Sequence, residues 1–439
     1  MDLFQKFINM INDLTKHKLN VSVVFVTQIL VAVGSLIAIR LFTEFISPDI
    51  FGQYKLVLSS ISFGVGIFTR PIIQFAMREY HVAVKNSIKE SFLKKMGNLF
   101  NKYVGTIILV IGFTYFFISV FQQSKDNLIG SSILIVGSLI VLWLTTKIEF
   151  EVALLVSKNN QLVAGIIKAA LKWGIPFTII TLIFIIKESV FVMILGTILA
   201  QLLVWVSIIY YNKSDILFKD NHIYSESVLL SKSIKFGWPI AIIGVLSWLI
   251  NESDRFFILY YHNTSEVGIY AAAYGLISAP FIMGSGAVAQ FSFPFIFRDS
   301  VKSKNIVSLV NKILIVNTSI VIIGILLVFF FKDIIAYIGL SEVYRNEALE
   351  LFLWIAIGYG FYAMSTSFDL AAYGEERTKD MLISYLVASS INVVFNFLLI
   401  PNYASKGAVI ATMISLISYF FCMAVIFYTR SKSFINDKK

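Results

Sequence analysis

The chain consists mainly of long apolar stretches separated by short polar breaks. Each stretch is about as long as the ~20-residue helix that crosses the hydrocarbon core of a bilayer. Within a stretch the apolar residues are continuous and do not alternate with polar ones, which is unlike the strands of a membrane β-barrel. The pattern therefore predicts an all-α polytopic membrane protein with about 12 transmembrane helices, at 20–42, 54–77, 102–121, 128–148, 162–186, 189–211, 236–260, 267–296, 306–331, 348–370, 381–400 and 406–428.

The composition agrees with many lipid-facing helices. Hydrophobic residues make up 58% of the 439 residues and charged residues 14%, against roughly 45–50% and 25% in soluble proteins. One cysteine and four histidines allow no internal disulfide and offer no metal-ligand spacing. No nucleotide-binding P-loop is present, and the longest predicted outer connection, 332–347, is too short for a glycosyltransferase or polymerase site. We therefore expect a protein that moves a solute, needs no cofactor and is not an enzyme.

Basic residues are distributed unevenly between the predicted loops. If the N-terminus is cytoplasmic, most of the 36 Lys and Arg residues fall in inner loops and at inner helix ends, as the positive-inside rule requires. Both termini are then cytoplasmic. The net charge of +10 therefore faces anionic lipid headgroups, and we expect no nucleic-acid partner.

Two predicted outer connections carry the same short motif. SPDIFGQYKLVLSSISFG and TSEVGIYAAAYGLISAPF both place Gly-x-Tyr at the start of the next helix, as Gly52/Tyr54 and Gly268/Tyr270, 216 residues apart. Parallel repeats related by an axis along the membrane normal are typical of secondary transporters, which carry the substrate path between them. We therefore expect two lobes of six helices each, over 20–211 and 236–428.

The remaining segments are assigned to the inner side of the membrane. Residues 212–235 form the predicted linker between the lobes, and residues 429–439 a cytoplasmic tail. Residues 1–19 have the apolar spacing of an amphipathic helix that lies on the inner leaflet. A disordered tail is the alternative for so short a segment.

Several ionisable residues interrupt the apolar stretches, where even low estimates of the insertion cost reach about 2.5–3.5 kcal/mol. Arg70 lies deep in the second predicted helix beside Pro71, and we expect it to face a cavity. Arg40, late in the first helix, either snorkels to the outer interface or faces the lumen. Lys168 and Lys172 share one helix face and are open to the same two interpretations. Asp369, near an inner helix end, is either interfacial or a lumen acid.

The most unusual stretch is WLINESDRFFILYY, residues 248–261, because four strongly polar side chains lie inside an apolar run. On a continuous helix Asn251, Glu252, Asp254 and Arg255 fall on one arc. Arg255 then has Asn251 at i−4 and Glu252 at i−3, both at pairing distance. Two acids share one local base, so one carboxylate needs a cation from another helix, a coupling ion or a proton. A buried ion pair that locks two helices together is the structural alternative to a gating and coupling site.

These motifs resemble those of one known family. FGWPIAIIGVLSWLINESDRFFILYYHNTSEVGIYAAAYGLISAP is similar to the start of the second half of bacterial polysaccharide exporters, with its Gly-x-Pro entry, Asp-Arg pair and Val-Gly-x-Tyr. FGQY at 51–54, Arg70 and SKGAVIATMIS before the last helix are similar to the same family. The chain thus resembles the Wzx-type O-antigen flippases of the multidrug/oligosaccharidyl-lipid/polysaccharide exporter superfamily.

The resemblance implies a MATE-like, V-shaped fold of two six-helix lobes around a cationic cavity that opens alternately to each side of the bacterial inner membrane. The implied cargo is an undecaprenyl-pyrophosphate-linked oligosaccharide of the O-antigen or capsule type. Arginine forks suit a pyrophosphate, so the expected contacts to it are Arg70, Arg40, Lys168 and Lys172. The expected coupling and gating residues, driven by a proton or cation gradient, are Asn251, Glu252, Asp254, Arg255 and Asp369.

The resemblance also implies partners and one competing function. The expected partners are the lipid-linked oligosaccharide, membrane lipids, a polysaccharide polymerase and a chain-length regulator. A MATE-type multidrug/cation antiporter is the alternative, although its cavity would be more acidic and aromatic. Arg70, the deepest isolated charge, favours an anionic cargo.

Overall fold

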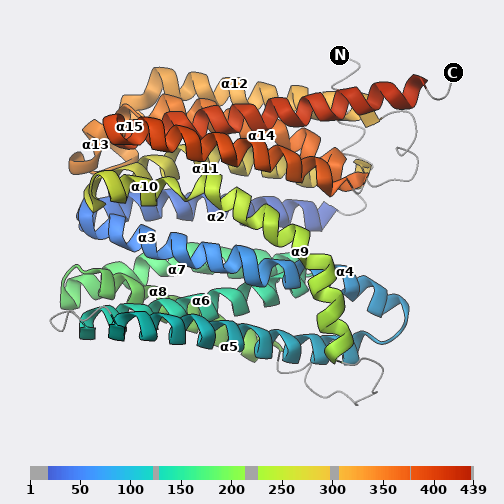
Figure 1. Cartoon of the computed structure of the whole chain (residues 1–439), viewed down its shortest axis with the longest axis horizontal. Coiled ribbons are helices and arrows are strands. Elements are labelled where there is room, and N and C mark those ends of the chain that lie inside the picture. Colours follow the sequence, from blue (N-terminus) through green and yellow to red (C-terminus); the bar gives the residue numbers. More distant parts are fainter. Residues whose placement is uncertain (1–17, 122–127, 213–225, 297–305, 376, 437–439) are drawn as a thin grey trace.

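The structure is a computed structural model that describes residues 18–121, 128–212, 226–296, 306–375 and 377–436, and every regular element within these ranges is helical (Figure 1). The first half contains α2 (Lys18–Phe45), α3 (Pro48–Gly64), the π-helical turn η2 (Val65–Thr69), α4 (Arg70–Lys85), α5 (Lys89–Phe121), α6 (Leu128–Ser157), α7 (Gln161–Ile186) and α8 (Val190–Asn212). The second half contains α9 (Glu226–Asn251), α10 (Asp254–Tyr261), α11 (Thr264–Ile296), α12 (Ile306–Gly339), α13 (Glu342–Leu349), α14 (Phe352–Gly374) and α15 (Thr378–Asn436).

All twelve predicted apolar runs fall on these helices. Nine helical segments of the described chain are long and apolar enough to cross a membrane, and α13 with α14, bent by 66°, forms a tenth. The chain is therefore a multi-pass membrane protein, as predicted.

The longest segment, α15, holds the last two predicted helices. Its backbone leaves helical geometry at Ala404, where φ is 47°. On either side of this kink Ser415 Oγ donates to the carbonyl oxygen of Ala388 at 2.8 Å, and the rings of Tyr385 and Tyr419 lie 4.6 Å apart. A residue farther before the kink thus meets one farther after it, so the two parts of α15 run antiparallel.

Some predicted boundaries differ from those of the structure. Residues 226–235, assigned to the linker, form the first turns of α9, and residues 429–436, assigned to the tail, continue α15. The predicted amphipathic helix lies almost wholly outside the described residues. Helix α6 continues to Ser157, nine residues beyond its predicted end at 148, because Lys147, Glu149 and Glu151 are accommodated within the helix.

The helices lie side by side in two groups (Figure 1). Helices α5 to α8 form one group and α11 to α15 the other, with α2 and α3 between them. Helix α2 packs on α7 and also meets α11, and α3 packs on α11. The described chain starts with α2 and finishes with α15 at the same end of the bundle. We call the opposite end, with α13 and the α2–α3, α7–α8 and α10–α11 links, the α13 end.

Helix α9 crosses from one group to the other (Figure 1). Its first turns place Leu229 and Phe236 in an apolar cluster with Phe75 of α4 and Phe100 of α5. Its later turns pack on α15. Helix α9 thus contacts both groups and connects the first half of the chain to the second.

Candidate functional site

The polar stretch 251–255 lies at a break between two helices. Helix α9 ends at Asn251 and α10 begins at Asp254, although the sequence predicted one continuous helix over 236–260. The backbone N–H of Glu252 still donates to Trp248 O at 2.9 Å, whereas that of Phe256 donates to Ser253 O at 2.9 Å, one residue closer than in an α-helix. The side chains at this break have partners on several neighbouring helices.

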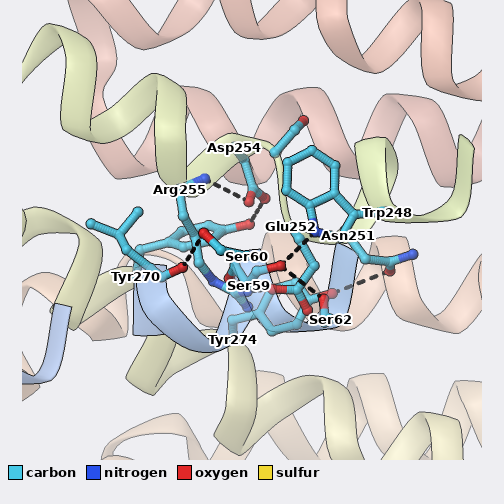
Figure 2. Close-up of polar contacts among 12 residues, drawn as sticks. Ser59, Ser60, Ser62, Trp248, Asn251, Glu252, Asp254, Arg255, Tyr270 and Tyr274 are labelled. Atoms are coloured by element: carbon cyan, nitrogen blue, oxygen red, sulfur yellow. Dashed lines mark hydrogen bonds and ion pairs between the residues drawn. The ribbon is translucent and has the colours of Figure 1, made fainter. Parts of the chain in front are cut away.

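Glu252 and Arg255 form the predicted ion pair, and the pair is bound to the first lobe through α3 (Figure 2). Ser59 Oγ donates to Glu252 Oε2 at 2.6 Å and accepts from Arg255 Nη1 at 2.6 Å. The indole N–H of Trp248 donates to the Ser59 carbonyl oxygen at 2.8 Å. Arg255 also lies over the ring of Tyr274, 5.4 Å from its centroid. One serine of α3 thus joins both members of the pair across the lobe interface.

Asp254, the second acid of the stretch, is not part of this ion pair, and it is fully buried. It forms no ion pair with any described residue. Its carboxylate accepts from the Arg255 backbone N–H at 2.8 Å, from the Tyr270 hydroxyl and from Thr412 Oγ1 at 3.4 Å. Of the three fates predicted for the second carboxylate, a cation from another helix does not occur in the described part of the chain. Binding of an ion or a proton remains.

Uncharged oxygen-bearing groups continue the site beyond Asp254. Thr412 accepts from Asn392 Nδ2 at 3.3 Å, and Asn392 Oδ1 accepts from Asn396 Nδ2 at 2.9 Å. Both asparagines are fully buried, and Asn396 Oδ1 has no hydrogen-bond partner among the residues that the structure describes. Oxygen ligands are those that hard cations prefer. The described residues contain no cluster of three His, Cys, Asp or Glu that suits a metal ion, so the arrangement fits a monovalent cation or a proton better than a transition metal.

The sequence placed Asn251 at pairing distance from Arg255, but in the structure Asn251 forms its hydrogen bonds with other residues. Its Oδ1 accepts hydrogen bonds from Tyr359 of α14 at 2.7 Å and from Tyr274 of α11 at 3.2 Å, and its Nδ2 donates to Ser247 O at 2.7 Å. Asn251 therefore holds the end of α9 against the second lobe, while Glu252 and Arg255 hold the break against the first.

The expected pyrophosphate contacts separate into two groups. Arg70 and Lys168 are exposed and both lie within electrostatic range of Glu149 on α6. Lys172 is also exposed, and it acts electrostatically on Lys55 of α3, as Arg255 does. The structure thus places Arg70 and Lys168 near Glu149, and Lys172 and Arg255 near Lys55.

Arg40 and Asp369 lie apart from the groups to which the sequence assigned them. Arg40 pairs with Glu44 at 2.7 Å and donates to the carbonyl oxygen of Leu340, at the α13 end. Asp369 accepts from the Tyr419 hydroxyl at 2.7 Å. It lies within electrostatic range of Tyr362, as does Arg70, and is ten residues, about 15 Å of helix, from Tyr359. Tyr362, whose ring packs on Tyr359 at 5.9 Å, lies between Asp369 and the tyrosines that contact the 251–255 break.

The repeated Gly-x-Tyr motifs meet at the α13 end. A Cβ atom on Gly52 would lie 1.9 Å from the carbonyl oxygen of Thr264, and one on Gly268 would lie 2.0 Å from that of Pro48. Thr264 and Pro48 are themselves 216 residues apart, as the glycines are, so the two contacts are equivalent by the repeat. We call this contact of α3 with α11 the seam. Only glycine allows the backbones to approach so closely, and the seam closes the α13 end between the lobes.

Four residues of the site escaped the sequence analysis for different reasons. Glu149 lies one residue beyond the predicted end of its helix, and Lys55 is the second residue of the predicted helix 54–77. Asn392 and Asn396 are uncharged in an apolar run, and only their neighbours in space set them apart.

Comparisons with known proteins were made on both sequence and structure. A sequence model of the family described as polysaccharide biosynthesis protein matches residues 166–331, and no curated protein matches the sequence. The lipid II flippase MurJ in an inward closed conformation is similar with a TM-score of 0.72 at 16% identity, over 95% of this chain and 89% of that chain.

Two transporter structures are similar over nearly their whole length. An inward-facing multidrug resistance MATE family transporter of the MOP superfamily gives a TM-score of 0.67 at 11% identity, over 95% of this chain and 99% of that chain. The Vibrio cholerae MATE transporter VcmN in the bent form gives 0.65 at 12% identity, over 96% and 99%. The chain therefore has the fold that these flippase and transporter structures share. The family match, over residues 166–331, agrees with the predicted resemblance to polysaccharide proteins.

Proposed function

We propose that the chain flips an undecaprenyl-pyrophosphate-linked oligosaccharide of the O-antigen or capsule type from the cytoplasmic to the periplasmic leaflet of the bacterial inner membrane. The match of residues 166–331 to a polysaccharide biosynthesis family carries the proposal, because this range contains Lys168, Lys172 and the whole polar break at 251–255. The fold shared with a structure named as a lipid II flippase supports a lipid-linked cargo.

The positions of the cationic side chains suit an anion that crosses the bilayer in steps. At 1.5 Å per helical residue, Arg70 lies about 33 Å from Pro48 at the α13 end, Lys172 about 21 Å from Ile186, and Lys55 about 10 Å from Pro48. A pyrophosphate that enters beside Arg70 and Lys168 would next meet Lys172 and Lys55. Glu149, which neighbours Arg70 and Lys168, would act as their counter-ion when no cargo is bound.

The buried carboxylate of Asp254 is the proposed coupling group. A carboxylate without a cation in the interior is costly, so the site favours a bound proton or a cation held also by Thr412 and Asn396. Asp254 and its partner Arg255 are consecutive residues, and Arg255 contacts Ser59 of the first lobe. Occupation of the Asp254 site would therefore change the contact between the lobes.

In this proposal the α13 end faces the periplasm, and the structure represents the state that receives cargo from the cytoplasm. The seam is closed by Gly52 and Gly268. Release of cargo requires the seam to separate, as alternating access demands.

The proposal is tested by expressing the chain in flippase-deficient strains, each of which makes a defined repeat unit. We expect the wild type to restore surface polysaccharide and Arg70→Ala to abolish it at equal membrane abundance. Lys85→Ala is the matched control, because Lys85 is an exposed cation on the same helix, α4, outside the proposed path. Failure of the wild type with every repeat unit, or full export by Arg70→Ala, would contradict the proposal.

A MATE-type multidrug/cation antiporter is the second candidate, and the similarity to two MATE transporter structures favours it. The two functions predict opposite charge on the cargo. Protection from cationic drugs that survives in Arg70→Ala, together with no rescue of polysaccharide export, would establish the antiporter.

A further inference from the structure

A polar cavity of about 770 Å³ lies at the α13 end, between the two lobes. Its volume falls within the range of roughly 300–1,000 Å³ typical of small-molecule sites. We call it the end cavity. One wall comes from α2 and the α7–α8 link, and the other from the end of α12 and from α13. The charged lining residues are Arg40, Glu44, Glu188, Glu342 and Arg345, and Tyr337 is one of the aromatic ones.

Hydrogen bonds between the lobes form the floor of the end cavity. Ser341 Oγ donates to Thr43 O at 2.5 Å, and the Tyr344 hydroxyl donates to Ile46 O at 2.8 Å. The first bond joins α2 to Ser341, just before α13, and the second joins the residue after α2 to α13 itself. The cavity is therefore complete only while the lobes are in contact at this end, and separation of the seam would divide it into two half-sites.

The charges of the end cavity disfavour the anionic part of the proposed cargo. Three carboxylates, Glu44, Glu188 and Glu342, face two guanidinium groups, and Arg40 is already paired with Glu44. A pyrophosphate would meet excess negative charge there, which makes this site unlike the cationic groups around Arg70 and Lys172.

The same lining suits a ligand rich in hydroxyl groups. Glu188 accepts only the Ser47 backbone N–H, at 2.9 Å, and Glu342 has no partner among the described residues, so both retain acceptor capacity. Arg345 Nε is buried without a partner in the described part of the chain. The ring of Tyr337 is 68% exposed and carries the Arg345 guanidinium on it, 4.9 Å from the centroid. Donors, acceptors and an exposed ring around one cavity are the groups that a sugar engages.

We propose that the end cavity binds a saccharide from the outer side of the membrane and thereby holds the lobes closed at the α13 end. The orientation and the source of the saccharide rest on the proposed function. A ligand that binds only the closed state stabilises it in proportion to its concentration, and at ten times its dissociation constant it raises the closed-to-open ratio about elevenfold. Exported saccharide that accumulates outside therefore slows further export.

Binding is tested on the full chain in lipid nanodiscs by calorimetry. The probe is the soluble oligosaccharide repeat unit of the host's own surface polysaccharide, freed of lipid and phosphate, and inorganic pyrophosphate serves as the anionic probe. We expect the oligosaccharide to bind and Tyr337→Ala with Glu342→Gln to weaken it at least about tenfold. Glu350→Gln is the matched control, because Glu350 is an exposed acid near α13 that does not line the cavity. Pyrophosphate is expected not to bind at this site.

The conformational part is tested with spin labels on Cys422→Ser protein at Ile186→Cys and Asn346→Cys, one in each lobe near the α13 end. We expect the oligosaccharide to narrow the distance distribution toward its shorter component. Absence of binding, binding equal in the Tyr337/Glu342 variant and the wild type, or a distribution that the oligosaccharide leaves unchanged would each overturn the proposal. Complementation separates the two hypotheses: a wild type that restores export but binds no saccharide refutes only the end cavity.

Discussion

The seam between the two Gly-x-Tyr motifs makes a quantitative prediction for Gly268→Ala. The added Cβ would lie 2.0 Å from the carbonyl oxygen of Pro48 and 3.1 Å from the backbone nitrogen of Gly52. Carbon and oxygen atoms that touch without a bond are about 3.3–3.6 Å apart, so the backbones of α3 and α11 must separate by at least about 1.3 Å. Both clashing atoms belong to the backbone, and no side-chain rotation relieves them.

The cost of this separation falls on the closed state alone. Overpacking of a well-packed contact costs about 1–3 kcal/mol, which corresponds to roughly a 5- to 150-fold change in an equilibrium between two states. We therefore expect Gly268→Ala to move the protein away from the state closed at the α13 end. Gly52→Ala should have a similar effect, because its Cβ would lie 1.9 Å from Thr264 O in the equivalent contact.

Electron–electron double resonance between labels at Ile186→Cys and Asn346→Cys measures the separation. Gly286→Ala is the control, because it lies on the same helix, α11, and an added Cβ there has no atom within 4 Å. We expect the distance between the labels to lengthen in both seam variants and to stay unchanged in the control. Equal distance distributions in Gly268→Ala and Gly286→Ala would refute the view that close backbone contact closes this end.

Three further predictions concern the charged groups. Asp254→Asn keeps the size of the side chain and removes its charge, so we expect flipping in proteoliposomes to lose its dependence on the sodium or proton gradient; an unchanged dependence would place coupling elsewhere. Tyr270→Phe removes a donor from a fully buried carboxylate and should lower the free energy of unfolding by about 1–3 kcal/mol. The loss should exceed that of Tyr274→Phe, because the Tyr274 hydroxyl donates to the neutral Asn251 at 3.2 Å. Equal losses in thermal unfolding would argue against a charged acceptor. Arg70→Lys should export less than the wild type but more than Arg70→Ala, because it keeps the charge and loses the fork; equal export by both variants would exclude a charge-based role.

The sequence predicted the helices well because lipid imposes a strong condition on each of them. Every run of about 20 apolar residues lies on a helix, and the local pair of Glu252 and Arg255, three residues apart, forms as expected. The offset of the Gly-x-Tyr motifs also predicted a repeat, and the glycines of both motifs meet in space. The apolar runs, this local ion pair and the repeat could therefore be predicted from the sequence.

The errors arose where the partner of a polar residue is distant in the sequence. The predicted helix 128–148 stops before Glu149, because a charge in an apolar run resembles a helix end. In the structure Arg70 and Lys168, from two other helices, lie within electrostatic range of Glu149. The break after Asn251 was also missed, because the apolar pattern continues on both sides of a two-residue turn. The surroundings of Arg40 and Asp369 could not be predicted, since their partners Leu340 and Tyr419 are 300 and 50 residues away.

The 216-residue offset also relates residues whose chemistry has diverged between the lobes. Tyr54 and Tyr270 are equivalent, and Tyr54 bonds to Thr197 at 2.8 Å, whereas Tyr270 bonds to Asp254, which in turn accepts from Thr412. By the same offset, the residue equivalent to Asp254 is Ala38, the one equivalent to Arg70 is Gly286, and the one equivalent to Lys172 is Ala388. The buried acid thus occurs only in the second lobe and these cations only in the first. If both lobes descend from one scaffold, this division separates the site that takes up the coupling ion from the side chains that meet the anionic cargo. The break at 251–255, which bonds to Ser59 on one side and to Tyr359 on the other, is the described contact that links them.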